Sequence, residues 1–183
     1  KRASDLRATL TAAAEIDVIQ ARSAFSLLLD GVEPSLCSTS QIKYLKARHP
    51  LLIPGVQARL QPGNRRPAAE PVPNDIVVDP PNNTLVITGP NTGGKTVALK
   101  TAGLLALMAQ AGLHIPADHG SMTPVFRTVF SDIGDEQSIS DSLSTFSAHI
   151  TNIISLNRRL KLPALVLLDE IGTGTDPIEG GAL

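Results

Sequence analysis

Residues 84–101 read TLVITGPNTGGKTVALKT, an apolar run that leads through a glycine-rich turn into a segment with helical character. Within it, residues 89–96 match the pattern GxxxxGK[ST] without a gap. A triphosphate requires backbone N–H groups aimed at its oxygens, glycines that allow a close approach, and a cation near the β- and γ-phosphates. We therefore predict a phosphate loop in which Lys95 is the cation and the Thr96 hydroxyl binds Mg²⁺.

The predicted nucleotide contacts run along this loop into the first turn of the following helix. They are Gly89, Pro90, Asn91, Thr92, Gly93, Gly94, Lys95, Thr96 and Val97. The alternative is a glycine-rich strand-to-helix turn that binds no ligand, and the sequence around the loop argues against it.

An acidic pair follows a second apolar run near the end of the chain. Residues 164–168 are wholly apolar, as a strand buried on both faces requires, and Asp169 and Glu170 come directly after them. Parallel strands present ligand-binding residues at their carboxyl ends. We predict that Asp169 holds Mg²⁺, directly or through water, and that Glu170 orients or deprotonates the attacking water in phosphoryl transfer.

Composition limits the class of protein. A chain of 183 residues suffices for one domain with a sizeable core and an appendage. The net charge of −1 gives no electrostatic footprint for nucleic acid, so any such surface is expected elsewhere. Cys37 is the one cysteine, which excludes an internal disulfide and fits a reducing compartment. With no apolar run near the length of a membrane span, we predict a cytoplasmic protein without membrane contact.

The chain divides into a helical segment and an α/β domain. Residues 4–29 carry apolar residues at helical spacing and should pack on a partner, and Gly31 is a candidate C-terminal cap. We place the domain boundary between residues 35 and 36. In the second part, residues 61–73 lack periodicity and should form a surface loop. His49, between Arg48 and Pro50, is expected to be structural and not catalytic.

The remaining pattern predicts a sheet with crossover helices. The strand candidates are residues 76–78, 84–88, 113–117, 125–130 and 164–168. A buried helix should run from Lys95 to Ala111 and end at Gly112, and a second helix should follow Leu143.

Four stretches together resemble the ATPase domain of MutS proteins. They are residues 88–116 (TGPNTGGKTVALKTAGLLALMAQAGLHIP), residues 132–149 (DIGDEQSISDSLSTFSAH), residues 165–177 (LVLLDEIGTGTDP) and residues 48–52. The likeness covers most of the chain. The acidic loop, Ser147 with His149, and Asp176 with Pro177 are similar to the second bacterial branch, which lacks the mismatch-reading domain.

The resemblance implies a P-loop NTPase of the ABC type, a parallel or mixed sheet flanked by helices, that uses ATP or ADP and Mg²⁺. It implies a homodimer in which each site joins the phosphate loop of one subunit to the signature helix of the other. The N-terminal helix would be the returning end of a lever, and the missing parts of the domain and a small nuclease domain would lie outside these residues. By this likeness Ser144 would meet the γ-phosphate in trans, Gln137 would contact Mg²⁺ or water, residue Asp176 would lie in a loop that crosses the dimer interface, and Val72 and Pro73 would lie near the adenine.

By the same likeness, the function would be an ATP-driven switch in a DNA-binding protein that acts on branched DNA or recombination intermediates and suppresses recombination. An alternative in this branch is a ribosome-associated, rRNA-binding ATPase that separates stalled or collided ribosomes. A transporter nucleotide-binding subunit would call for an LSGGQ-like signature, whereas residues 143–147 read LSTFS. A nucleotide-binding module without hydrolysis is a further alternative.

Overall fold

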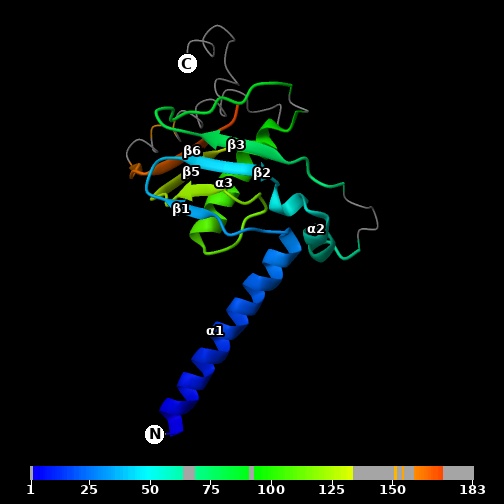
Figure 1. Cartoon of the computed structure of the whole chain (residues 1–183), viewed down its shortest axis with the longest axis vertical. Helices are drawn as coiled ribbons and strands as arrows, with labels where there is room; N and C mark the ends of the chain where they lie inside the picture. The colour runs from blue at the N-terminus through cyan, green and yellow to red at the C-terminus, as the bar shows by residue number, and fades with distance from the viewer. Residues whose placement is uncertain are drawn as a thin grey trace.

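The computed structural model describes residues 2–63, 69–90, 93–133, 151, 154 and 159–170. It is an α/β structure in which a long helix projects from two sheets (Figure 1). The first sheet is mixed, with strand order β1-β4-β2-β3, and the second pairs β5 with β6. The elements are α1 (Arg2–Leu29), β1 (Ser35–Cys37), β2 (Ile42–Ala47), η1 (Pro50–Leu52), α2 (Pro54–Leu60), β3 (Asn74–Val78), α3 (Lys95–Gln110), β4 (Met122–Pro124), β5 (Thr128–Asp132) and β6 (Ala164–Leu168).

The N-terminal helix has the predicted extent, but only its last turns pack on the sheets. Leu29 is fully buried, and Phe25 and Leu28 lie against the same core. Further out the helix leaves its apolar side chains exposed, for example Leu10 at 70% and Ile19 at 64%. The partner that the apolar pattern predicted is therefore not among the described residues.

The C-terminal cap of α1 differs from the prediction by one residue. Asp30, with φ 49°, takes the left-handed position, and the N–H of Gly31 donates to Ser26 O at 2.9 Å. The N–H of Asp30 also donates to Leu27 O at 3.3 Å, and the two bonds form a Schellman motif, in which the residue after the left-handed one closes the longer ring. Gly31 relieves crowding at this turn, because a Cβ there would lie 3.2 Å from the Cβ of His114.

The core of the first sheet contains a buried polar pair. Tyr44 on β2 and Thr123 on β4 are both fully buried, and the Tyr44 hydroxyl donates to Thr123 Oγ1 at 2.8 Å. Burial raises the pKa of Tyr44 to about 12. The hydroxyl therefore stays protonated, and this bond satisfies two groups that would otherwise destabilise the core.

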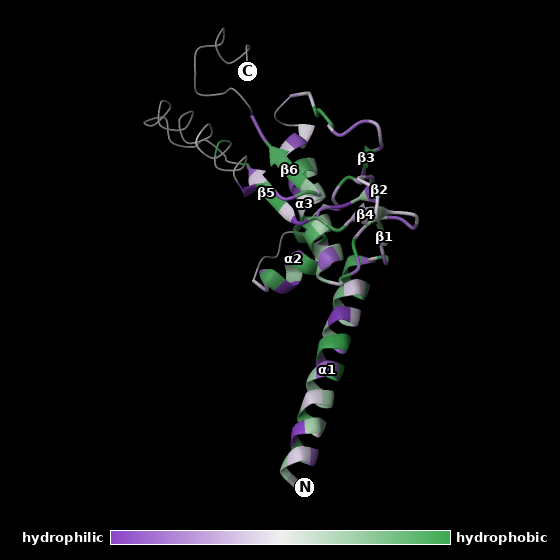
Figure 2. Cartoon of the chain, turned by 90° about the vertical axis from the view of Figure 1, so that its left-hand side faces the viewer, coloured by the Kyte–Doolittle hydropathy of each residue, from purple (hydrophilic) through white to green (hydrophobic). Residues whose placement is uncertain are grey.

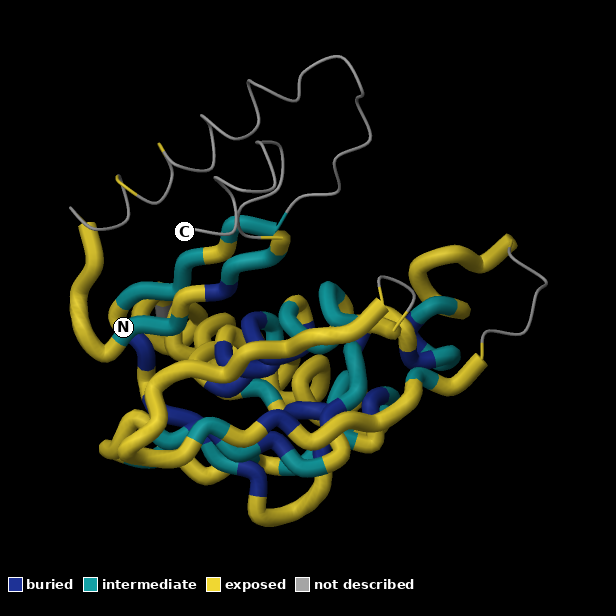
Figure 3. Tube along the Cα trace, turned by 90° about the horizontal axis from the view of Figure 1, so that it is seen from above, coloured by how far each residue is buried: buried dark blue, intermediate teal, exposed yellow. Residues whose placement is uncertain are grey.

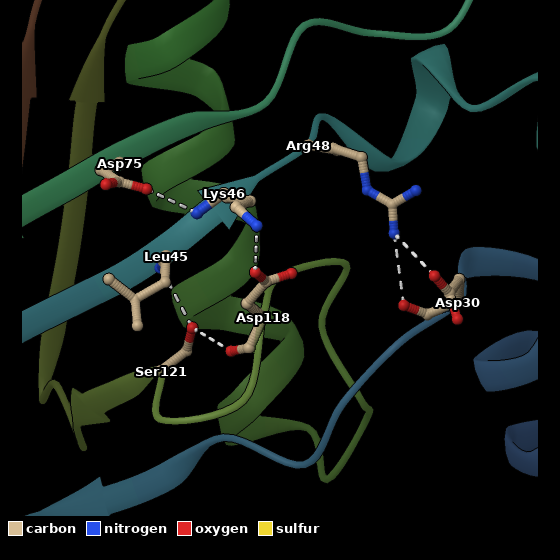
Figure 4. Close-up of polar contacts among 7 residues, drawn as sticks. All are labelled: Asp30, Leu45, Lys46, Arg48, Asp75, Asp118 and Ser121. Carbon is tan, nitrogen blue, oxygen red and sulfur yellow. Dashed lines mark hydrogen bonds and ion pairs between the residues drawn. The ribbon is translucent and has the colours of Figure 1, made fainter.

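A bulge interrupts β2 before it ends. The register with β3 shifts between Tyr44 and Ala47, and Lys46 has a φ of 44°. The N–H of Lys46 leaves the ladder and donates to the carboxylate of Asp75 at 2.7 Å, while its ammonium pairs with Asp118 at 3.0 Å (Figure 4). The hydrogen bond that the Lys46 ammonium donates to the Asp118 carboxylate raises the pKa of Lys46. The bulge sets the direction of the three residues that follow β2.

Helix α3 lies between the two sheets (Figure 2) and contacts β3, β4 and β6. Its buried residues, among them Leu105 and Ala106, form the centre of the core, and the buried part of the trace lies where α3 meets the sheets (Figure 3). At Gly103 a Cβ would overlap Leu167 Cδ1 of β6, so the glycine permits a close approach of helix and strand. The prediction of a buried helix that ends at Gly112 is confirmed, since Gly112 has a φ of 70° directly after the C-cap.

The prediction of a strand at residues 84–88 is wrong for the described structure. This segment is extended and exposed, with Val86 at 75%, and it pairs with no strand among the described residues. Its β-branched residues favour an extended backbone, but a strand also requires a neighbour to accept and donate its hydrogen bonds.

Other strand predictions met mixed outcomes. The runs at 76–78 and 164–168 are strands β3 and β6. The run at 125–130 is displaced, because β5 begins at Thr128. Residues 113–117 contribute a single bridge, between Ile115 and Val32, since Pro116 cannot donate to a ladder. The helix predicted after Leu143 lies outside the described residues, except for Thr151, Ile154 and Arg159, which are helical. None of the described helices is long and apolar enough to span a membrane.

Candidate functional site

The phosphate-loop motif enters helix α3 through a left-handed glycine. Gly94 is the N-cap residue with a φ of 78°, and Gly89 has a φ of 142°, conformations that a side chain disfavours. The first helical bond runs from Ala98 N to Gly94 O at 2.9 Å, and no side chain caps this end of α3 in the described part of the chain. The N–H groups of the first turn therefore provide an anion-binding arrangement.

The two polar side chains that open α3 reach in different directions. Lys95 Nζ donates to Gly89 O at 2.6 Å, so the ammonium lies across the loop. The Thr96 hydroxyl donates to Asp169 Oδ2 at 2.6 Å, which joins the phosphate-loop motif to the acidic pair across 73 residues of sequence. The structure thus brings Thr96 into contact with Asp169, while the Lys95 side chain turns back to Gly89 of the same loop.

The acidic pair lies at the carboxyl end of two parallel strands. β5 and β6 pair from Thr128 with Ala164 to Asp132 with Leu168, and the N–H of Asp169 donates to Asp132 O at 3.0 Å. Glu170 then turns out of the sheet with a φ of 48°, and its N–H donates to Asp169 Oδ1 at 3.1 Å. A left-handed glutamate costs conformational energy, and such residues concentrate at functional sites.

A pocket of about 310 Å³ opens beside the N-terminus of α3. Its walls come from the end of β2, the start of β3, the segment before β3, and the first two turns of α3. The lining residues are Ala47, His49, Leu52, Pro71, Val72, Asn74, Ile76, Gly93, Gly94, Val97, Ala98 and Thr101. The volume is at the lower end of the range for small-molecule sites, and the lining is largely apolar with a few polar groups, as such sites require.

His49 is the residue of this pocket that sequence reasoning missed. It lies two residues after the end of β2, and its Nδ1 is buried without a hydrogen-bond partner in the structure as described. Burial, and then the charge of Lys100, lower the pKa of its imidazole, so the ring is neutral at physiological pH. Its position near the end of a strand could have marked His49 as a candidate site residue. The bulge in β2 breaks the alternation of side chains, however, so the sequence does not show on which face of the sheet His49 lies.

The other predicted site residues divide into two groups. Val72 and Val97 line the pocket, whereas Pro73 is not among its lining residues. Pro90 accepts a hydrogen bond from Gly93 N at 2.9 Å, which closes a turn in the loop. Asn91, Thr92, Gln137, Ser144 and Asp176 lie outside the described residues.

Comparison with known proteins places the chain in a family. MutS domain V matches residues 85–183. The sequence is 55% identical over 175 residues to endonuclease MutS2 of Symbiobacterium thermophilum, covering 96% of this chain and 20% of that protein. It is 51% identical over the whole chain to endonuclease MutS2 of Pelotomaculum thermopropionicum, of which it covers 21%. It is also 51% identical over 168 residues to the putative endonuclease MutS2 of Bacillus subtilis, covering 92% of this chain and 20% of that protein. The chain therefore spans about a fifth of the length of these relatives. On this likeness, the chain belongs to the MutS family and is of the MutS2 type.

Proposed function

We propose that the chain binds ATP with Mg²⁺ and forms one half of an ATP-hydrolysing site. The observation that carries the proposal is the 2.6 Å hydrogen bond between Thr96 and Asp169. It joins a hydroxyl at the start of a phosphate-loop helix to a carboxylate at the end of a parallel strand. Membership of the MutS family supports the same reading.

The residues present fit a magnesium ion. Mg²⁺ prefers hard oxygen ligands and is commonly held by one or two protein groups together with substrate phosphates. The Thr96 hydroxyl and the Asp169 carboxylate are such oxygens and already lie at hydrogen-bond distance. When bound, the ion would neutralise charge on the phosphates.

The other groups of the site would bind the phosphates and activate the attacking water. Lys95 would turn its ammonium to the β- and γ-phosphates, and the N–H groups of the first turn of α3 would hold the other phosphate oxygens. Glu170 would orient the attacking water and accept its proton. Its backbone N–H donates to Asp169 Oδ1, so Glu170 directly adjoins the proposed ion ligand, which supports this role.

The pocket beside α3 would take the base and ribose. Gly93 and Gly94 line both the pocket and the phosphate loop, so one ligand can occupy both. Pro71 and Val72 supply the apolar walls that a purine face requires. This assignment adds His49 to the residues expected near the base.

The test is nucleotide binding measured with a fluorescent ATP analogue. Lys95→Ala should weaken binding at least about tenfold, since it removes a charge-assisted contact. Lys100→Ala, a change of the same kind at an exposed position of the same helix, is the matched control and should bind normally. Glu170→Gln should bind ATP but not release phosphate. Equal binding by the Lys95 and Lys100 variants would contradict the proposal.

At the level of the whole protein, we propose a homodimer in which Ser144 and the loop at Asp176 of one subunit complete the site of the other. Its ATP cycle would act on branched DNA, consistent with relatives that are named endonucleases. Binding of the full-length protein to four-way DNA junctions and to ribosomes at the same salt concentration separates this function from ribosome splitting. If the full-length protein sedimented preferentially with ribosomes, the proposed action on DNA would be wrong and ribosome splitting would take its place.

A further inference from the structure

The end of α1 is held by an arginine from the first sheet. The Arg48 guanidinium donates to Leu29 O at 3.0 Å. It also donates to Asp30 O at 3.3 Å and lies 3.7 Å from the Asp30 carboxylate (Figure 4). The first of these carbonyls belongs to the last turn of α1, where helical hydrogen bonds end and the helix dipole is negative. Arg48 therefore supplies both a donor and a positive charge to the C-terminus of α1.

The next residue in the chain lines the candidate nucleotide pocket. His49 contributes to the pocket wall, and its buried Nδ1 is without a partner in the described structure. A buried polar atom that lacks a hydrogen bond costs free energy, and a ligand or a small movement of the ring would remove that cost. Two adjacent side chains thus reach different places, Arg48 to the end of α1 and His49 to the pocket.

The backbone between them has little freedom. The N–H of Arg48 donates to Pro116 O at 2.9 Å, and Pro50 is fully buried and opens η1. The His49 ring can rotate about its own side-chain bonds, but a shift of the His49 backbone would pass directly to Arg48, because the two residues share a peptide unit and no free residue lies between them. The side chain of Arg48 is 22% exposed, so it is confined by packing and would follow.

A second set of contacts holds α1 from the far end of α3. Arg22 donates to Ala111 O at 3.2 Å, Ser26 Oγ lies 2.7 Å from His114 Nδ1, and Val32 and Ile115 exchange two backbone bonds of 2.9 Å. Ala111, which accepts from Arg22, directly follows the 16-residue helix α3 and so lies about 24 Å from the phosphate loop, the length of that helix. These contacts hold α1 without touching the pocket, whereas Arg48 is one residue away from it.

We propose that Arg48 is a positioning residue that couples occupancy of the pocket to the last turn of α1. The inference rests on the proposed nucleotide site. A bound nucleotide would satisfy His49 and favour one arrangement of residues 48–50, and Arg48 would carry that preference to Leu29 and Asp30. The contacts of Arg22 and Ser26 would stay the same with and without nucleotide. A ligand can shift the position of α1 only if it binds one arrangement of residues 48–50 more tightly than the other.

The experiment is hydrogen–deuterium exchange of the whole protein with and without Mg²⁺ and a non-hydrolysable ATP analogue. The reporters are the amides of Asp30 and Gly31, both of which are hydrogen-bonded within the end of α1. In the unchanged protein, the analogue should slow their exchange by about tenfold. In Arg48→Met this difference should vanish while the affinity for the analogue stays within about twofold. Arg127→Met, at an exposed arginine of the other sheet, is the matched control and should keep the difference.

The outcomes separate the coupling from the site itself. A purely structural Arg48 would speed exchange equally in both states and leave the nucleotide-dependent difference intact, which would overturn the inference. An unchanged protein that binds the analogue without slower exchange at these amides would also overturn it. Failure of the unchanged protein to bind would instead overturn the proposed nucleotide site, and the coupling with it. If Arg48→Met lowers global stability, Arg48→Lys, which keeps one cation, should retain part of the difference.

Discussion

At the scale of single residues, two left-handed conformations flank the bond between Thr96 and Asp169. Gly94 takes a φ of 78° before the helix, and Glu170 takes a φ of 48° after the strand. The first costs little because glycine lacks a Cβ, whereas the second is strained. The spacing of the motif predicted the glycine. The conformation of Glu170 depends on how β6 ends beside Asp132, which no local pattern encodes.

His49 gives a prediction about acid stability. Burial, and then the charge of Lys100, lower the pKa of its imidazole in the folded protein, whereas the unfolded chain takes up the proton near the usual value of about 6.5. Between these two values the unfolded state binds more protons, so the free energy of unfolding falls as the pH falls through this window. Above the pKa of the unfolded chain, about 6.5, His49 is neutral in both states and causes no loss of stability.

The measurement is urea unfolding from pH 7.5 to pH 4.5. His49→Gln should reduce the acid-side loss of stability, and His119→Gln, at an exposed histidine, should leave the profile unchanged. Identical profiles for the His49 variant and the unchanged protein would contradict this account.

Sequence predicted the charged part of the site better than its walls. Lys95, Thr96 and Asp169 belong to patterns whose spacing follows from phosphate chemistry, and the structure brings Thr96 into contact with Asp169. His49 and Thr101 line the pocket because of where β2 bulges and how α3 is rotated. Both depend on tertiary contacts, so periodicity along the chain does not reveal them.

At the scale of elements, the approach of α3 to β6 depends on Gly103. We expect Gly103→Ala to destabilise the fold by about 1 kcal/mol, because overpacking of about 1–3 kcal/mol exceeds a gain of nearly 1 kcal/mol in helix propensity. Leu167→Ala alone should cost about 2–4 kcal/mol through the cavity it leaves.

A double-mutant cycle measured by chemical denaturation tests the contact. The pair Gly103→Ala with Leu167→Ala should cost less than the sum of the two single changes, because the new methyl group enters the space left by leucine. Strict additivity would show that the two residues do not press on each other.

The elements that sequence predicted are those that their own composition identifies, although their packing contacts are with distant parts of the chain. Helices α1 and α3 carry sustained apolar periodicity, and β6 is an unbroken apolar run. Strand β4 has only three residues and contains Pro124, so its pairing is set by β1 and β2 and not by its own composition. Residues 84–88 have the composition of a strand and lack a partner in the described structure, which shows that composition alone does not make a sheet.

At the scale of the whole molecule, the proposed composite site gives a prediction about activity. One copy of the chain supplies the phosphate loop and the acidic pair, and a second copy would supply the groups at Ser144 and Asp176. We therefore expect residues 1–183 alone to show weak or absent ATP turnover at low concentration. Phosphate release should be measured over a range of protein concentrations, with Lys95→Ala as the background. Clear turnover at low concentration that Lys95→Ala abolishes would contradict the composite site.

The bond between Lys95 and Gly89 has a consequence for selectivity. Any phosphate that recruits this ammonium competes with a carbonyl of the same loop, which already accepts from it at 2.6 Å. The free energy gained is the difference between the two contacts, and it grows with the negative charge on the competitor. A monophosphate or a neutral ligand would gain little over the internal carbonyl, whereas a polyphosphate would gain much. The ammonium of Lys95 should therefore leave the Gly89 carbonyl only for a ligand that carries several negative charges.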